Sequence, residues 1–170
     1  MEQKGKDHLQ IRLRVNGEAY ELIVETNETL LELIRNRLGL TGTKQSCDME
    51  VCGACTVLLD GKPVSSCTTL AFEARDREVV TIEGLASKGK LHPIQEAFLE
   101  KGGLQCGFCT PGMILTSKAL LEENPDPTEE EIREYMHGNL CRCTGYYMIV
   151  ESVLAAAEKI RGDLECRKVN

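Results

Sequence analysis

Four cysteines in the N-terminal half of the chain have a spacing that suits metal ligation. Cys47, Cys52 and Cys55 follow a C-x4-C-x2-C pattern, and Cys67 comes after eleven further residues. Three thiolates that converge on a small cluster must come from one loop, whereas the fourth can come from a neighbouring segment. This spacing is typical of a plant-type [2Fe–2S] cluster. A zinc site, which more often uses two C-x2-C pairs, and disulfides are the alternatives.

A second set of four cysteines lies in the C-terminal half. Cys106 and Cys109 form a C-x2-C pair, Cys141 and Cys143 form a C-x-C pair, and 31 residues separate the pairs. Residues two apart on a regular helix face different sides, so the C-x-C pair is predicted to lie on a turn. Four thiolates again suit one [2Fe–2S] cluster, and a structural zinc site is the alternative.

A weak internal repeat surrounds this second set. Cys109-Thr110-Pro111 and Cys143-Thr144-Gly145 each place a cysteine just before a predicted helix, with threonine in the cap position. Both helices would then direct N-terminal N–H groups toward a negatively charged cluster. We expect a pseudo-two-fold pair of long helices with the metal at their starts.

Composition restricts the classes of function. The chain has 170 residues, 42% of them hydrophobic, which is enough for one domain or two small ones. Its net charge is −7 without a basic patch, so nucleic acid is not an expected partner. No apolar run approaches the roughly 18 residues of a membrane span, and no export signal is recognisable.

The distribution of the nine cysteines indicates the compartment. Their number is odd and eight fall into two groups, which favours metal ligation in a reducing environment over disulfides. We therefore expect a cytoplasmic protein. Cys166 is interpreted as a free thiol in a polar tail after the last helix. His8, His92 and His137 are expected at surface or cap positions rather than as ligands.

The elements that must position the first set form a small mixed sheet wrapped on one helix. Two-residue hairpin turns are predicted at Asn16-Gly17 and Asp60-Gly61. Alternating and short apolar runs predict strands at about residues 9–15, 19–25, 56–59, 63–65 and 79–82, and a helix at 29–38.

The periodicity becomes helical after a linker at residues 84–90. Helices are predicted at about residues 93–101, 111–123, 128–137 and 145–161, the third opened by a capping box at Thr128 and Glu131. The expected fold is α+β, with a ferredoxin-like domain at residues 1–83 followed by a helical domain, a four-helix bundle, at residues 84–170.

The surroundings of the cysteines resemble a known family. Residues 105–113 read Gln-Cys-Gly-Phe-Cys-Thr-Pro-Gly-Met, residues 138–146 read Gly-Asn-Leu-Cys-Arg-Cys-Thr-Gly-Tyr, and residues 52–61 read Cys-Gly-Ala-Cys-Thr-Val-Leu-Leu-Asp-Gly. These stretches are similar to the small iron–sulfur subunit of molybdenum hydroxylases, the xanthine dehydrogenase family. Aerobic carbon monoxide dehydrogenase and 4-hydroxybenzoyl-CoA reductase contain small subunits of this kind. The resemblance covers residues 9–160.

The resemblance implies a β-grasp first domain, an electron-transfer role and two partners. A large subunit would carry molybdopterin and a medium subunit FAD, and single electrons would pass between them through two [2Fe–2S] clusters. Cys106, Cys109, Cys141 and Cys143 would hold the cluster nearer molybdenum, and the other four cysteines the cluster nearer the flavin. Gln105 and the backbone near Cys143 would contact the pterin.

One loop departs from the family pattern. Relatives often carry glycine between the first two cysteines, where this chain has Asp48-Met49-Glu50-Val51. Glycine lets backbone N–H groups turn toward sulfur at positive φ, which costs other residues more. Ligation is expected to survive, whereas the cluster's potential is open to change.

Two alternatives belong to other functional classes. A free-standing two-cluster ferredoxin would shuttle electrons between partners without staying bound to them. A zinc-stapled interaction module would be colourless. Nothing in the sequence suggests a nucleophile–histidine pair, a phosphate-binding loop or a dinucleotide fingerprint, so no substrate chemistry is expected on this chain.

Overall fold

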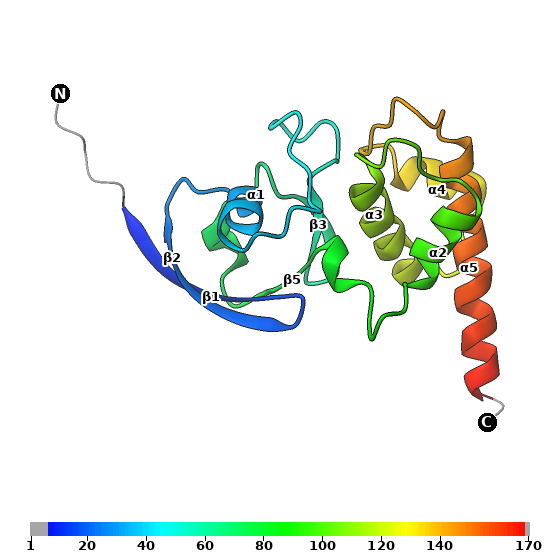
Figure 1. Ribbon diagram of the computed structural model, residues 1–170, viewed down its shortest axis with the longest axis horizontal. Helices are drawn as coiled ribbons and strands as arrows, with labels where there is room; N and C mark the ends of the chain where they lie inside the picture. Colours follow the sequence, from blue (N-terminus) through cyan, green and yellow to red (C-terminus); the bar gives the residue numbers. More distant parts are fainter. Residues whose placement is uncertain (1–6, 169–170) are drawn as a thin grey trace.

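The chain folds into a sheet-containing half and a helical half that lie side by side (Figure 1). This computed structural model describes residues 7–168, with side chains as far as residue 162. The fold is α+β, as predicted. Each half has its own hydrophobic core, and the predicted division between residues 83 and 84 stays a prediction.

Five strands form one mixed sheet in the order β2-β1-β5-β3-β4. Only β1 and β5 run parallel to each other, and the other neighbouring pairs are antiparallel. The strands are β1 (His8–Val15), β2 (Glu18–Glu25), β3 (Thr56–Leu59), β4 (Lys62–Ser65) and β5 (Glu78–Val80). The hairpins predicted at Asn16-Gly17 and Asp60-Gly61 are confirmed, since all four residues have positive φ. The last strand was predicted to reach Ile82, but it ends at Val80 because Ile82–Gly84 forms a 3₁₀ turn, η3.

The strand β3 contributes to both cores. All four of its residues are buried. Val57 and Leu59 belong to the core under the sheet, whereas Leu58 belongs to the core of the helical half. Because successive side chains of a strand point to opposite faces, β3 joins the two halves of the molecule.

The helix predicted at residues 29–38 is irregular. It begins as α1 (Leu30–Glu32), which Thr29 and Glu32 cap reciprocally, and continues as a π-helix, η1 (Leu33–Arg37). The N–H of Leu38 reaches the carbonyl of Leu33, five residues back, at 3.1 Å. A prediction from apolar spacing could not detect this wide turn, because the same leucine and isoleucine side chains are buried either way.

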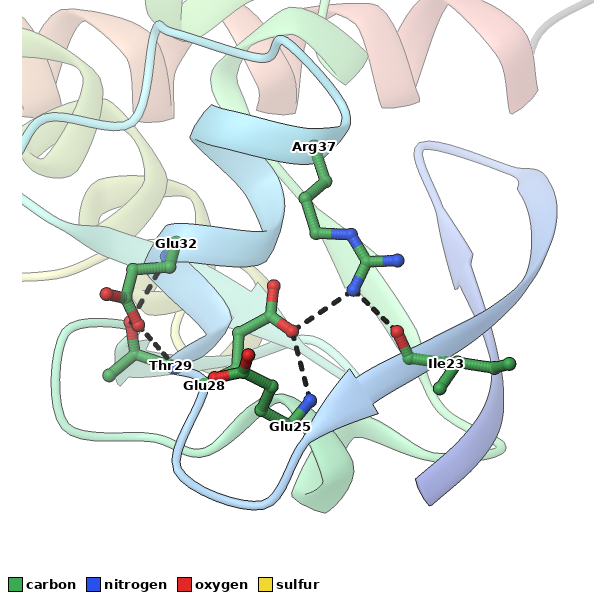
Figure 2. A network of polar contacts seen from close by, with 6 residues as sticks. All are labelled: Ile23, Glu25, Glu28, Thr29, Glu32 and Arg37. Atoms are coloured by element: carbon green, nitrogen blue, oxygen red, sulfur yellow. Dashed lines mark hydrogen bonds and ion pairs between the residues drawn. The ribbon is translucent and has the colours of Figure 1, made fainter. Parts of the chain in front are cut away.

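A polar network connects the end of η1 to the sheet (Figure 2). Arg37 Nη1 donates to the carbonyl oxygen of Ile23 at 2.7 Å and pairs with Glu28 Oε2 at 3.1 Å. The same carboxylate oxygen accepts from the backbone N–H of Glu25 at 3.4 Å. Arg37 therefore joins the last turn of η1 to the end of β2.

Four helices make up the second half: α2 (Pro93–Glu100), α3 (Thr110–Glu123), α4 (Glu129–Tyr135) and α5 (Tyr147–Lys168). The capping box of Thr128 and Glu131 is confirmed. The last helix was predicted at residues 145–161, but it starts later because Gly145 and Tyr146 both have positive φ. It also runs further and includes the backbone of Cys166, which was predicted to follow it; that side chain lies outside those described.

Candidate iron–sulfur centres

The first cysteine loop lies between η1 and β3 and gathers backbone N–H groups around a sulfur. The N–H of Val51 donates to Cys47 Sγ at 3.4 Å. Backbone hydrogen bonds from Met49 and then Val51 lower the pKa of Cys47 to about 7. Asp48 and Glu50 have φ values of 54° and 60°. Two residues that are not glycine therefore adopt the left-handed backbone that this loop needs, at a conformational cost.

Within the first set, the four thiols are arranged as two pairs. Cys47 lies within hydrogen-bond reach of the Cys52 side chain, and Cys55 lies within reach of the Cys67 side chain. Burial, more than the neighbouring thiols, raises the pKa of Cys55 to about 12. Cys55 and Cys67 are only 3% and 8% exposed, so this pair faces the interior.

The second set has the same arrangement in pairs. Cys106 Sγ and Cys143 Sγ lie 3.5 Å apart, and Cys109 lies beside Cys141. Burial raises the pKa of Cys109 to about 12. Burial also acts to raise the pKa of Cys141, but hydrogen bonds from the side chain and backbone of Thr144 outweigh it and lower the pKa. The pair Cys141 and Cys143 lies on a non-helical turn, as predicted.

This pairing decides which metal group the thiols fit. Four-thiolate zinc needs all its ligands around one point, whereas a [2Fe–2S] cluster takes two thiolates on each iron. The two thiol pairs in each set match the two irons of such a cluster.

Two buried hydroxyl groups near the cysteine sets have no hydrogen-bond acceptor in the described part of the chain. Thr110 Oγ1, next to Cys109, and Thr43 Oγ1, just ahead of the first cysteine loop, find no hydrogen-bond partner among the described residues. A buried hydroxyl without a partner is costly, so both positions suit a bound group that can accept a hydrogen bond. The sulfur atoms of a cluster could accept from such groups.

The predicted repeat is only partly present. Thr110 is the first residue of α3 rather than its cap, and Cys109 in the cap position makes no side-chain cap bond. Thr144 Oγ1 accepts from the N–H of Tyr146, before α5 begins. Both threonine-cap predictions are therefore wrong, since Thr110 lies one position after the cap of α3 and Thr144 lies three positions before the first residue of α5. Only α3 starts directly at a cysteine, and the predicted pseudo-two-fold relation stays a prediction.

The loops of the two sets contact each other through the main chain. The N–H of Leu140 donates to the carbonyl oxygen of Cys52 at 2.9 Å. Next to it, the buried side chain of Asn139 donates to the carbonyl oxygen of Gly53 at 3.1 Å. In Figure 1 the two loops project from the same edge, the first in cyan and the second in orange. Sequence reasoning used Asn139 only as a turn signal and did not detect this contact.

Both sets lie near exposed apolar side chains. Met49 and Val51 are exposed on the first loop. Gln105, Cys106 and Cys143 are also exposed. Exposed apolar side chains around the second set are Phe108, Leu140, Tyr146, Tyr147 and Met148. Sequence reasoning missed this apolar surface, although the run Tyr146-Tyr147-Met148 after Gly145 could have indicated it.

Comparisons with known proteins agree with this geometry. A family model for the 2Fe-2S iron-sulfur cluster binding domain matches residues 13–85, and one for the [2Fe-2S] binding domain matches residues 81–154. The nicotinate dehydrogenase small FeS subunit of Eubacterium barkeri is 52% identical to the chain, covering 88% of the chain and 95% of the relative. The chain belongs to the family of small iron–sulfur subunits of molybdenum hydroxylases.

Further relatives of the iron–sulfur subunit support the same assignment. The nicotine 6-hydroxylase small subunit of Paenarthrobacter nicotinovorans is 50% identical, covering 91% of the chain and 93% of the relative. The crystal structure of quinoline 2-oxidoreductase from Pseudomonas putida 86 has a chain with a TM-score of 0.87 and 44% identity, covering 91% of this chain and 97% of that one.

The iron–sulfur subunit is thus the electron-transfer subunit of a molybdenum-dependent oxidoreductase complex and has two [2Fe–2S] cofactors. The prediction of this role is confirmed. None of the helices in the described part of the chain has the length and apolar character needed to cross a membrane.

Proposed function

We propose that eight cysteines of this subunit hold its two [2Fe–2S] clusters, four on each. The first centre would use Cys47, Cys52, Cys55 and Cys67, and the second Cys106, Cys109, Cys141 and Cys143. The observation that carries this assignment is the arrangement of each set as two close thiol pairs, including the 3.5 Å separation of Cys106 and Cys143. Such clusters supply reversible single-electron transfer.

The chain itself would control each centre through burial and hydrogen bonding. Backbone N–H groups of the first loop favour a thiolate at Cys47, and Thr144 does the same at Cys141. Donors to sulfur stabilise negative charge and therefore favour the reduced state. Cys55 and Cys67 are enclosed, so water has little access to that side of the first centre.

We infer that each centre faces a different partner subunit. The second would lie at the large molybdopterin-binding subunit, with Gln105 and the backbone near Cys143 at the pterin, and the first at a medium FAD-binding subunit. Two observations support this orientation. Gln105 and Cys143 are exposed, and each cysteine set has its own group of exposed apolar side chains nearby. The word "small" in the relatives' names also implies larger companions.

The substrate would be bound by a partner rather than by this chain. The relatives act, by name, on nicotinate, nicotine, quinoline and aldehydes, although their iron–sulfur chains or segments resemble this one at 43–52% identity.

We also infer a cytoplasmic location, domains at residues 1–83 and 84–170, and a four-helix bundle of α2 to α5. The mutual packing of these helices supports the last point.

Purification of the native complex under anaerobic conditions tests this function. We expect about four irons per small chain, two distinct EPR signals in the reduced state, and co-purification of larger chains that contain molybdenum and flavin. Zinc, or clearly fewer than about four irons, would overturn the ligand assignment. A full iron content without any co-purifying chain would instead favour a free-standing ferredoxin.

A further inference from the structure

A buried amide lies between the two cysteine loops. Asn139 is 6% exposed and precedes Cys141 by two residues. Its Nδ2 donates to the carbonyl oxygen of Gly53 at 3.1 Å and lies 3.4 Å from Thr56 Oγ1. Its Oδ1 accepts from Thr116 Oγ1 at 3.0 Å. One side chain therefore bonds to the first cysteine loop, to the strand β3 that follows it, and to α3.

Hydrogen-bond chemistry fixes the orientation of this amide. The carbonyl oxygen of Gly53 can only accept, so the NH2 group of Asn139 must face it. The carbonyl group of the amide then faces Thr116, whose hydroxyl donates. No other side chain of this size supplies a donor on one side and an acceptor on the other without charge.

Two glycines bring the main chains at this junction into direct contact. A Cβ atom on Gly53 would lie 2.5 Å from Asn139 Nδ2, and one on Gly112 would lie 2.2 Å from the carbonyl oxygen of Gly53. Gly53 lies between Cys52 and Cys55, and Gly112 lies three residues after Cys109. Parts of both cysteine sets are therefore held together without intervening side chains.

We propose that Asn139 is a positioning residue that fixes the separation of the two cysteine sets and thereby the rate of electron transfer between them. The proposal rests on the proposed function. In that step a single electron leaves the reduced centre and enters the oxidised one, with no bond formed or broken. Its rate is steeply sensitive to distance, as reactions between fixed groups are to misplacement of about 1 Å.

The variant Asn139→Leu tests the proposal in the native complex. Leucine has a similar size and branching but removes the donor from the second cysteine loop to the Gly53 carbonyl, which then accepts only from the N–H and hydroxyl of Thr56, at 3.2 and 2.8 Å. We expect an unchanged iron content and a rate of electron transfer between the centres that is lower by about tenfold or more. A second readout is the magnetic splitting between the two centres in the fully reduced EPR spectrum, which falls steeply with their separation and should decrease.

Thr116→Val is the matched control. It removes only the hydroxyl that donates to Asn139 Oδ1 and keeps the bond from Nδ2 to Gly53. We expect it to lower thermal stability while the splitting and the rate stay at their native values. Equal changes in both variants would overturn the proposal, because general loosening of the helical half would then explain them.

A further variant keeps the test decisive if Asn139→Leu does not fold. Gly112→Ala retains the amide but forces the start of α3 away from Gly53, so it should also change the splitting. Native splitting and native rate in either folded variant would refute the role of this junction. The iron content of each sample reports separately on the ligand assignment, so its failure is distinguishable.

Discussion

The backbone N–H of Leu140 and the carbonyl oxygen of Cys52 form a hydrogen bond of 2.9 Å. Leu140 directly precedes Cys141, so one hydrogen bond connects the main chain of a first-set cysteine to that of the residue before a second-set cysteine. Because both partners are backbone atoms, substitutions other than Leu140→Pro leave the donor and the acceptor in place. The side chains that hold it in place are therefore the ones to test.

Loss of one thiol from the second set should remove one centre and spare the other. We expect Cys109→Ala to reduce iron from about four to about two per chain and to leave a single reduced-state EPR signal. Cys166→Ala is the control, since that residue belongs to neither set, and should keep all the iron. Complete loss of iron from Cys109→Ala would contradict two independent centres.

The carboxylate of Glu50 should lower the potential of the first centre. It lies 3.3 Å from the hydroxyl of Thr68, the neighbour of Cys67. Reduction adds negative charge, so removing an exposed negative charge favours the reduced form. About 0.5–1 kcal/mol of Coulomb energy corresponds to a rise of roughly 20–40 mV for a one-electron couple.

Two substitutions separate the effect of the Glu50 charge from the effect of its backbone conformation. Glu50→Gln and Glu50→Gly should both raise the potential in a redox titration followed by EPR. Only Glu50→Gly should also increase stability, by about 1–2 kcal/mol, because φ is 60° at this position. An unchanged titration of both variants would show that the carboxylate does not act on the centre.

Arg35 should hold the segment that leads into the first cysteine loop. Its Nη1 donates to the carbonyl oxygens of Thr41 and Thr43 at 2.9 and 2.6 Å. Hydrogen bonds to a charged group contribute about 1.5–3 kcal/mol, so we expect Arg35→Met to lower the unfolding free energy by this order. It should also accelerate release of iron from the first centre to a chelator.

Arg37→Met is the comparison for this experiment. Arg37 also donates to a backbone carbonyl, but that of Ile23 at the end of β2 (Figure 2). The Arg37→Met variant should have lower thermal stability but should not release iron from the first centre faster than the native chain. Similar release rates from the two variants would mean that Arg35 has no specific effect on the loop.

Stability should fall on the acid side because of His92. Its Nδ1 accepts from the N–H of Ile94 at the start of α2, which requires the neutral ring. Burial, and then the charge of Lys118, lower the pKa of His92 below its usual 6.5, against a smaller opposing effect of Glu122. Above pH 6.5 this contribution is fully present, and it is lost as pH falls toward the folded-state pKa.

Urea denaturation at about pH 7 and about pH 5.5 measures this effect. His92→Ser keeps a capping oxygen but does not titrate in this range. The variant should therefore lose less stability than the native chain between these two conditions. An identical loss in both proteins would assign the acid sensitivity to carboxylates elsewhere.

Local signals in the sequence predicted much of the fold. Asn16-Gly17 specifies its turn through positive φ, and Thr128 with Glu131 caps α4 through neighbours three residues apart. The π-helix at Leu33–Arg37 has no such local signal, because its apolar side chains are buried in a π-helix as they would be in an α-helix. Apolar spacing therefore predicted a regular helix.

The sequence predicts which sulfur atoms belong to each site but not how the two sites are connected. Cysteine spacing indicates two sets, yet it says nothing of how they are joined. The partners of Asn139 lie up to 86 residues away in the chain, and no periodic pattern relates them. The late start of α5 was missed for a different reason, since Tyr146 adopts a positive φ that aromatic residues rarely take.

The unequal exposure of the two cysteine sets has a consequence for biogenesis. Cys55 and Cys67 are enclosed, whereas Cys106 and Cys143 are open to solvent. Accessible thiolates are the ones that oxygen and peroxide attack first. We therefore expect a newly synthesised chain to retain its first metal centre in air, whereas the second should persist only after a partner subunit covers it. Only chains that have assembled with a partner would then keep both centres.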